Sequence, residues 1–159
     1  MKLDIGGGVK PRGEGFVNID CLECADVKLN LGVDPLPFED NSVDEVYSSH
    51  CLEHVVNVLE LVGEILRVCK IGAKIEIRVP HWAHPFACHP GHVHVISNRE
   101  LFFWCEQPPQ KWTKNLIMTR PLHYQPEVEY YELRTSFPLL TDEQVLRLSP
   151  GCCWEVRAY

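Results

Sequence analysis

Histidine is concentrated in one short segment of this 159-residue chain, where five of the eight histidines lie between residues 81 and 94. Imidazole changes its protonation state near neutral pH, so it can serve as a general base for a hydroxyl or amine. We expect this segment to line a substrate pocket, although at least four of the histidines should only cap, pack or face solvent. The candidate catalytic residues are His50, His81, His84 and His92.

A metal-binding module is the alternative interpretation of the same segment. Zinc prefers nitrogen and sulfur ligands of this kind, but the spacing fits no familiar zinc pattern, and an α/β domain of this length needs no metal for its core. We therefore predict no metal ligand and keep the module as an alternative. Cys21 and Cys24 have redox or zinc spacing, yet the long helix of a redox site does not follow them. The donors of the alternative module are His81, His84, Cys88, His89, His92 and His94.

A second group of polar and glycine residues follows the predicted strands in order. Residues 6–8 are three glycines after the first strand, Asp20 ends the second strand, and Asn30 ends the third with Leu31 beside it. Ligands of open α/β sheets bind beyond the carboxyl ends of the strands. Glycines permit close backbone approach, a carboxylate can accept from both ribose hydroxyls, and an amide can bond an adenine edge. Together they predict a site for a nucleoside-bearing ligand.

Short strands and one long helix position these residues. Apolar residues from Leu52 to Leu66 recur at intervals of three and four, which predicts a buried helix, and Gly72 supplies its C-terminal stop. A strand, helix, strand order requires a parallel strand pair, so the fold class is α/β. The predicted strands are residues 2–5, 16–20, 27–31, 43–48 and 74–79.

The second half of the chain has weaker signals. Ser97 and Glu100 form a capping box that opens a second helix, and Thr141 opens a short one through Leu148. Residues 114–135 alternate like a hairpin, and residues 154–159 are typical of a last strand. We predict a single domain over residues 1–159, with a cofactor-binding half at 1–80 and an acceptor-side half at 81–159.

Four segments in the first half resemble motifs of the class I S-adenosylmethionine-dependent methyltransferases, particularly their small, compact branch. The resemblance implies a Rossmann-like, mostly parallel sheet and S-adenosylmethionine as the cofactor. It covers about residues 2–80, and the segments are Leu3 to Gly8, Gly15 to Asp20, Leu36 to Val46 and Ser49 to His54.

The resemblance also implies roles for individual residues. Asp4 would orient the glycine loop, Gly6 and Gly8 would face the methionine part, Asp20 the ribose, Asn30 and Leu31 the adenine, and Ser49 or His50 the sulfur side. His54 would make a structural hydrogen bond. The predicted cofactor-binding residues are Asp4, Gly6, Gly7, Gly8, Asp20, Cys21, Asn30, Leu31, Ser49 and His50.

One feature argues against a different class of nucleotide-binding protein, and another distinguishes this chain from typical members of the family that it resembles. A dinucleotide dehydrogenase is the obvious competitor, but the glycine loop lacks the third-glycine spacing and Pro11 spoils a helix that would begin at the loop. The family usually has a helix between its first two strands, whereas Val9 to Gly15 is too short for one. We therefore expect a minimal version of the fold with the first crossover helix shortened or absent.

Composition limits the partners. The net charge of −7 argues against nucleic acid, because phosphate binding draws on clustered Lys and Arg. No leader-like or bilayer-length apolar stretch is visible, so we expect a cytoplasmic protein without membrane contact. The predicted function is a methyltransferase for a small-molecule or sugar-like acceptor, and the oligomeric state stays open. The alternatives are a catalytically silent cofactor-binding or interaction subunit and the metal-binding module.

Overall fold

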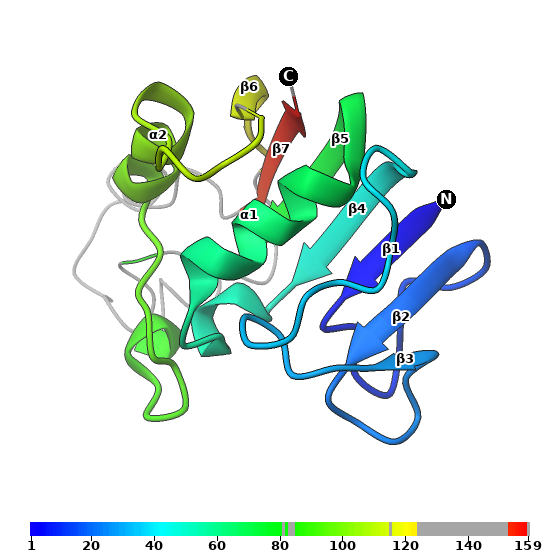
Figure 1. The fold of residues 1–159 in the computed structure, drawn as a ribbon. Coiled ribbons are helices and arrows are strands. Elements are labelled where there is room, and N and C mark those ends of the chain that lie inside the picture. Colours follow the sequence, from blue (N-terminus) through cyan, green and yellow to red (C-terminus); the bar gives the residue numbers. More distant parts are fainter. Residues whose placement is uncertain (81, 83–84, 115, 124–152, 159) are drawn as a thin grey trace.

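The computed structural model describes residues 1–80, 82, 85–114, 116–123 and 153–158, and its strands form one seven-stranded sheet (Figure 1). The strand order is β3-β2-β1-β4-β5-β7-β6. In chain order the elements are β1 (Lys2–Ile5), β2 (Phe16–Asp20), β3 (Val27–Lys28), β4 (Val43–Ser49), the 3-10 helix η1 (Leu52–His54), α1 (Val58–Val68), β5 (Cys69–Arg78), the 3-10 helix η2 (Pro85–Cys88), α2 (Asn98–Glu106), β6 (Leu116–His123) and β7 (Cys153–Ala158).

Strands β1 to β5 run parallel to one another, and β7 runs antiparallel to both β5 and β6. The chain builds outward from β1 to β2 and β3, then crosses back to β4 and β5 on the other side. Ile5 pairs in register with Ile19 on one side and Ser48 on the other, so three strands end at one edge. The order reverses between β1 and β4, which is where such sheets bind ligands. The predicted α/β, Rossmann-like sheet is confirmed.

The early crossovers contain no helix. Residues 6–15 between β1 and β2, 21–26 between β2 and β3, and 29–42 between β3 and β4 are turns and loops. The prediction of a minimal fold without the first crossover helix is therefore confirmed. Strand β3 has only two residues, shorter than the predicted 27–31, so Asn30 and Leu31 belong to the loop that follows it.

Helix α1 supplies the main core on one face of the sheet (Figure 1). It buries Leu61, Val62, Ile65 and Leu66, and these residues share a core cluster with Leu3, Ile5, Val46, Ile75 and Ile77 of the strands. Burying one such side chain contributes about 1.5–3 kcal/mol, so this layer fixes how β1, β4 and β5 lie against one another. Trp104 of α2 and Trp112 extend the cluster, with their rings 6.3 Å apart in an edge-on arrangement.

Two predicted boundaries of this helix are wrong. The apolar residues from Leu52 onward form the short turn η1, and Val55 is extended, so the α-helix begins only at Val58. The helix also ends at Val68, because Cys69 is extended and already pairs with Val43 of β4. Gly72 lies within β5 at φ +82°, where the register with β4 shifts, and does not cap the helix.

The second half matches the remaining predictions where it is described. Ser97 caps α2, accepting a hydrogen bond from the Glu100 N–H at 3.2 Å. Strand β7 confirms the predicted last strand, and β6 pairs with it. The predicted helix from Thr141 to Leu148 and residues 124–135 of the predicted hairpin lie outside the described residues. None of the helices in the described part of the chain is long and apolar enough to span a membrane.

Candidate functional site

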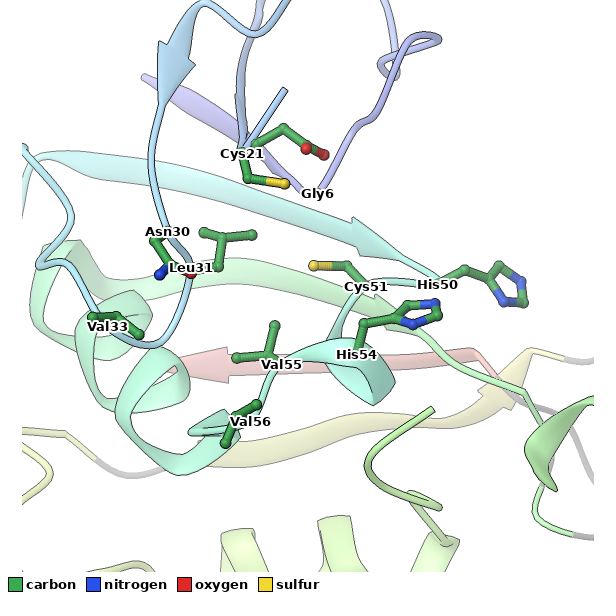
Figure 2. Close-up of a pocket in the computed structure, with 11 residues that line it drawn as sticks. Gly6, Cys21, Asn30, Leu31, Val33, His50, Cys51, His54, Val55 and Val56 are labelled. Atoms are coloured by element: carbon green, nitrogen blue, oxygen red, sulfur yellow. The ribbon is translucent and has the colours of Figure 1, made fainter. Parts of the chain in front are cut away.

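A pocket of about 370 Å³ opens at the carboxyl ends of the parallel strands, close to the reversal point (Figure 2). Its volume lies in the range of small-molecule sites. Six of the predicted cofactor-binding residues line it, and they come from the ends of four strands. The described lining residues are Gly6, Asp20, Cys21, Asn30, Leu31, Val33, His50, Cys51, His54, Val55 and Val56.

Asp20 is the carboxylate of this pocket. One of its oxygens accepts from the Gly8 N–H at 3.0 Å and the other accepts from the Leu22 N–H at 3.1 Å. These bonds fix the orientation of the carboxylate and tie the end of β2 to the glycine loop. Each carboxylate oxygen can accept more than one hydrogen bond, so both oxygens keep capacity for a ligand hydroxyl.

Gly6 brings the loop after β1 very close to the segment after β4. It has φ +73°, and a Cβ at this position would lie 2.3 Å from Cys51 Sγ and 2.4 Å from Cys51 Cβ. Only glycine fits without displacing Cys51, which is buried. The close approach forms the base of the pocket.

Asp4 lies behind the pocket and holds the glycine loop in shape. Its Oδ2 accepts from the Arg12 N–H at 2.6 Å. Burial raises the pKa of Asp4, while the hydrogen bond from the Arg12 backbone and the Arg12 charge oppose that rise. Asn18 of β2 supports the same loop by donating from Nδ2 to the Gly8 carbonyl at 3.1 Å. A Cβ on Gly7 would lie 2.6 Å from Asp4 Oδ2 and 2.5 Å from Asn18 Oδ1, so these two side chains confine the loop.

The pocket wall away from Asp20 and the glycine loop is apolar. Leu31 and Val33 come from the loop after β3, and Val55 and Val56 from the segment between η1 and α1 (Figure 2). The two segments touch at Gly32, where an added Cβ would lie 2.6 Å from Val55 Cγ1. Such a wall suits a flat, largely apolar group.

Arg67 of α1 anchors the far part of the loop that carries this wall. Its guanidinium donates to the Leu36 carbonyl at 2.8 Å and to the Phe38 carbonyl at 3.0 Å, and it pairs with Glu64 at 2.8 Å and Asp40 at 2.6 Å. The Glu64 and Asp40 carboxylates raise the pKa of Arg67 further above its ordinary value. The loop is therefore attached to the helix at several points after it leaves the pocket.

Cys51 is the thiol at the centre of the pocket (Figure 2). Burial, with the nearby Glu53 charge, raises the pKa of Cys51 to about 12. The thiol therefore stays protonated at neutral pH and acts as a small apolar surface rather than as a nucleophile.

His50 lies at the mouth of the pocket with its side chain 63% exposed, and its backbone has φ +52°. Its Nδ1 is 3.4 Å from Oε1 of Glu53, a fully buried carboxylate. The ring is thus held near a carboxylate at the mouth of the pocket. That combination is compatible with a base, as the sequence predicts.

The other predicted site residues lie elsewhere. Gly7 and Gly8 belong to the glycine loop but do not line the pocket, and Ser49 ends β4 opposite Arg78 of β5. His92 is half-buried beside His54, with ring centroids 4.6 Å apart, rather than in the pocket. His81 and His84 lie outside the described residues.

Several functional positions were missed from the sequence. Cys51 lies just before η1, and Val55 and Val56 line the pocket because the chain leaves the helical conformation between η1 and α1, which the helical periodicity concealed. His54 makes the expected structural hydrogen bond, to the Gly91 carbonyl at 2.8 Å, and also faces the pocket. Asn18 could have been identified from the sequence, because a polar amide within a short apolar strand is expected to be buried and to need a hydrogen-bond partner.

The fold and the pocket together define a class of protein. The parallel strands follow the order β3-β2-β1-β4-β5, and the antiparallel strands β7 and β6 complete the sheet. Glycine, carboxylate and apolar groups lie together close to the point where the strand order reverses. This is the Rossmann-like class that binds nucleoside-bearing ligands.

The comparisons with known proteins agree. Residues 18–77 match the family model described as a methyltransferase domain. A methyltransferase of Mycobacterium tuberculosis is 43% identical over 54 residues, which is 34% of this chain and 21% of that protein. A methyltransferase of Mycolicibacterium vanbaalenii is 38% identical over 65 residues, 40% of this chain and 26% of that protein. The matches thus span about a fifth to a quarter of these relatives' length.

A solved structure shows the same fold over nearly the whole chain. The S-adenosylmethionine-dependent methyltransferase of Archaeoglobus fulgidus superposes with a TM-score of 0.60 at 17% identity, covering 99% of this chain and 84% of that one. Over residues 18–77 the chain is thus similar to a methyltransferase domain, and it has the fold seen in S-adenosylmethionine-dependent methyltransferases.

Proposed function

We propose that this protein binds S-adenosylmethionine in the pocket at the strand ends and methylates a small acceptor. The observation that carries the proposal is the convergence of four strand ends on one pocket. Gly6 follows β1, Asp20 ends β2, Asn30 follows β3 and His50 follows β4, in the order that the resemblance implies.

The residues present fit this cofactor. Asp20, oriented by two backbone N–H groups, has acceptor capacity for ribose hydroxyls. Leu31, Val33 and Val55 offer an apolar wall for the adenine ring, and Asn30 lies beside them for its polar edge. Because Gly6 has no side chain, Cys51 packs close to it, and the Gly6 backbone together with the Cys51 thiol would face the methionine part. When bound, S-adenosylmethionine supplies an electrophilic methyl group on a sulfonium.

The chain contributes position and a proton acceptor. His50, at the pocket mouth with Nδ1 toward the Glu53 carboxylate, would take the proton of an acceptor hydroxyl or amine. Positioning by the pocket walls would supply much of the remaining rate. The net charge of −7 favours a small-molecule or sugar-like acceptor over nucleic acid.

Transfer of a labelled methyl group tests the proposal. The full chain is incubated with labelled S-adenosylmethionine and a panel of sugars, phenols and small amines. We expect transfer to one class, with turnover by His50→Gln reduced about 10²-fold or more. Cofactor binding without transfer to any acceptor would favour the catalytically silent subunit, and absence of both would contradict the proposal.

A further inference from the structure

The histidine-rich loop docks on the turn that follows β4. The N–H groups of Val93 and His94 both donate to the Glu53 carbonyl, at 2.9 and 3.1 Å. His94 Nε2 lies 3.1 Å from the Val56 carbonyl, and His54 Nδ1 lies 2.8 Å from the Gly91 carbonyl. These contacts are independent of one another, and together they place His92 beside Glu53 and His54.

Three side chains converge at this junction. One ligand-type atom from each of Glu53, His54 and His92 lies within 4.8 Å of the other two. Glu53 is 1% exposed, and neither of its carboxylate oxygens has a hydrogen-bond partner among the described residues. His92 Nδ1 is also buried without a partner there. Burying a carboxylate in this way is costly unless a cation or donor compensates it.

The neighbouring charged or titratable groups do not supply that compensation fully. His50 Nδ1 is 3.4 Å from Glu53 Oε1, but the His50 side chain is largely exposed to solvent. His89 packs near His92, with ring centroids 5.5 Å apart, yet its Nδ1 accepts the Gly91 N–H at 3.0 Å and its side chain is exposed. The junction thus has ligand atoms and a buried carboxyl group without a hydrogen-bond partner among the described residues.

The hydrogen bond of His54 selects the ring form that binds metals. A carbonyl oxygen can only accept, so His54 Nδ1 must carry the hydrogen that it donates to Gly91. In the neutral ring this leaves a lone pair on Nε2. Metal-binding histidines commonly donate their other ring N–H to a carbonyl in the same way, which fixes the ring orientation.

We propose that Glu53, His54 and His92 bind one divalent transition-metal ion, with Zn²⁺ as the best match. Two imidazoles and one carboxylate form a known zinc ligand set that leaves one position open. Ligands at zinc distances lie about 3.4 Å from one another, so the present spacing closes by small side-chain rotations. Because His54 also lines the pocket, the ion would lie at the pocket edge. This proposal goes beyond the proposed function and does not rest on it.

Metal binding is measured on the full chain after removal of metal with a chelator. Zn²⁺ is titrated by calorimetry, and Co²⁺ serves as a coloured probe of the ligand geometry. We expect one ion per chain, and at a hundred times the dissociation constant a rise in melting temperature of roughly 5–10 °C. Glu53→Gln and His92→Gln should each weaken the Zn²⁺ affinity by at least about 100-fold. Removing a residue that only hydrogen-bonds a metal ligand already weakens binding by about 10- to 100-fold, and loss of a ligand itself should weaken it at least as much.

His89→Gln is the matched control, because it alters a neighbouring histidine outside the ligand set and should leave the affinity within about threefold, a small change beside ligand loss. No stoichiometric binding by the wild-type chain would overturn the proposal, as would equal losses in His89→Gln and His92→Gln. If Glu53→Gln does not fold, His92→Gln and the Co²⁺ spectrum of the wild-type chain still decide the result. S-adenosylhomocysteine binding, scored separately on the same samples, reports on the proposed function and not on the metal.

Discussion

Replacing Gly6 with alanine should destabilise the fold much more than the same replacement at Gly8. Both glycines have positive φ, +73° and +59°, so each alanine has a backbone cost of about 1–2 kcal/mol. At Gly8 an added Cβ meets nothing within 4 Å, whereas at Gly6 it lies 2.3 Å from Cys51 Sγ. Displacing a buried side chain adds about 1–3 kcal/mol. We expect losses of about 2–5 kcal/mol for Gly6→Ala and about 1–2 kcal/mol for Gly8→Ala.

Urea unfolding of the two variants measures these losses, provided that the slope against denaturant is unchanged. A second substitution locates the cause. Cys51→Ala should not relieve Gly6→Ala, because Cys51 Cβ lies only 2.4 Å from the added atom, whereas Cys51→Gly removes both clashing atoms. The double-mutant cycle should therefore show favourable coupling only with Cys51→Gly. Equal losses at Gly6 and Gly8, or no coupling, would refute this explanation of the pocket base.

Three further outcomes follow from single contacts. Asp20→Asn should fold normally and weaken S-adenosylhomocysteine binding about 10- to 100-fold by calorimetry, since a charge-assisted bond contributes about 1.5–3 kcal/mol; unchanged affinity would remove Asp20 from the ribose site. Hydrogen bonding to Arg67 lowers the pKa of Glu64 below 4.5, so its stabilisation is present above that pH and lost as pH falls further. The urea midpoints of Glu64→Gln and the wild type should accordingly differ at pH 7 and converge as the pH is lowered well below 4.5, and a constant gap would contradict the pairing. Ser97→Ala should reduce stability by about 0.5–2 kcal/mol while Ser97→Asn changes it little, and equal melting temperatures for all three proteins would show that the cap is dispensable.

The strand ends were predictable because their signals are local. The glycine triplet, Asp20 and Asn30 each follow a short apolar run, and a parallel sheet brings such positions to one edge whatever the loops do. The absence of the first crossover helix was also predictable from the length of the connection alone, because residues 9–15 are too few to form a helical crossover. Local patterns therefore fixed the sheet and most of one pocket wall.

The rest depended on contacts between distant residues. The helical spacing of apolar residues predicted one continuous helix where the structure has η1 and then α1. That spacing gives no sign that Val55 is extended and lies close to Gly32. Nothing near Gly72 in the sequence shows that β5 begins before it, because the pairing partner Val43 lies far upstream. The meeting of Glu53 with His92 is likewise set by backbone bonds between segments about forty residues apart.

Calorimetric titration of the full chain with S-adenosylhomocysteine tests the central claim most directly, with a nicotinamide dinucleotide as the competing ligand. The pocket geometry predicts one site per chain for S-adenosylhomocysteine, a much weaker site in Asp20→Asn, and no heat with the dinucleotide. Absence of heat with S-adenosylhomocysteine at millimolar concentration, together with binding of the dinucleotide, would contradict the assignment of this pocket to a methyl-donor cofactor.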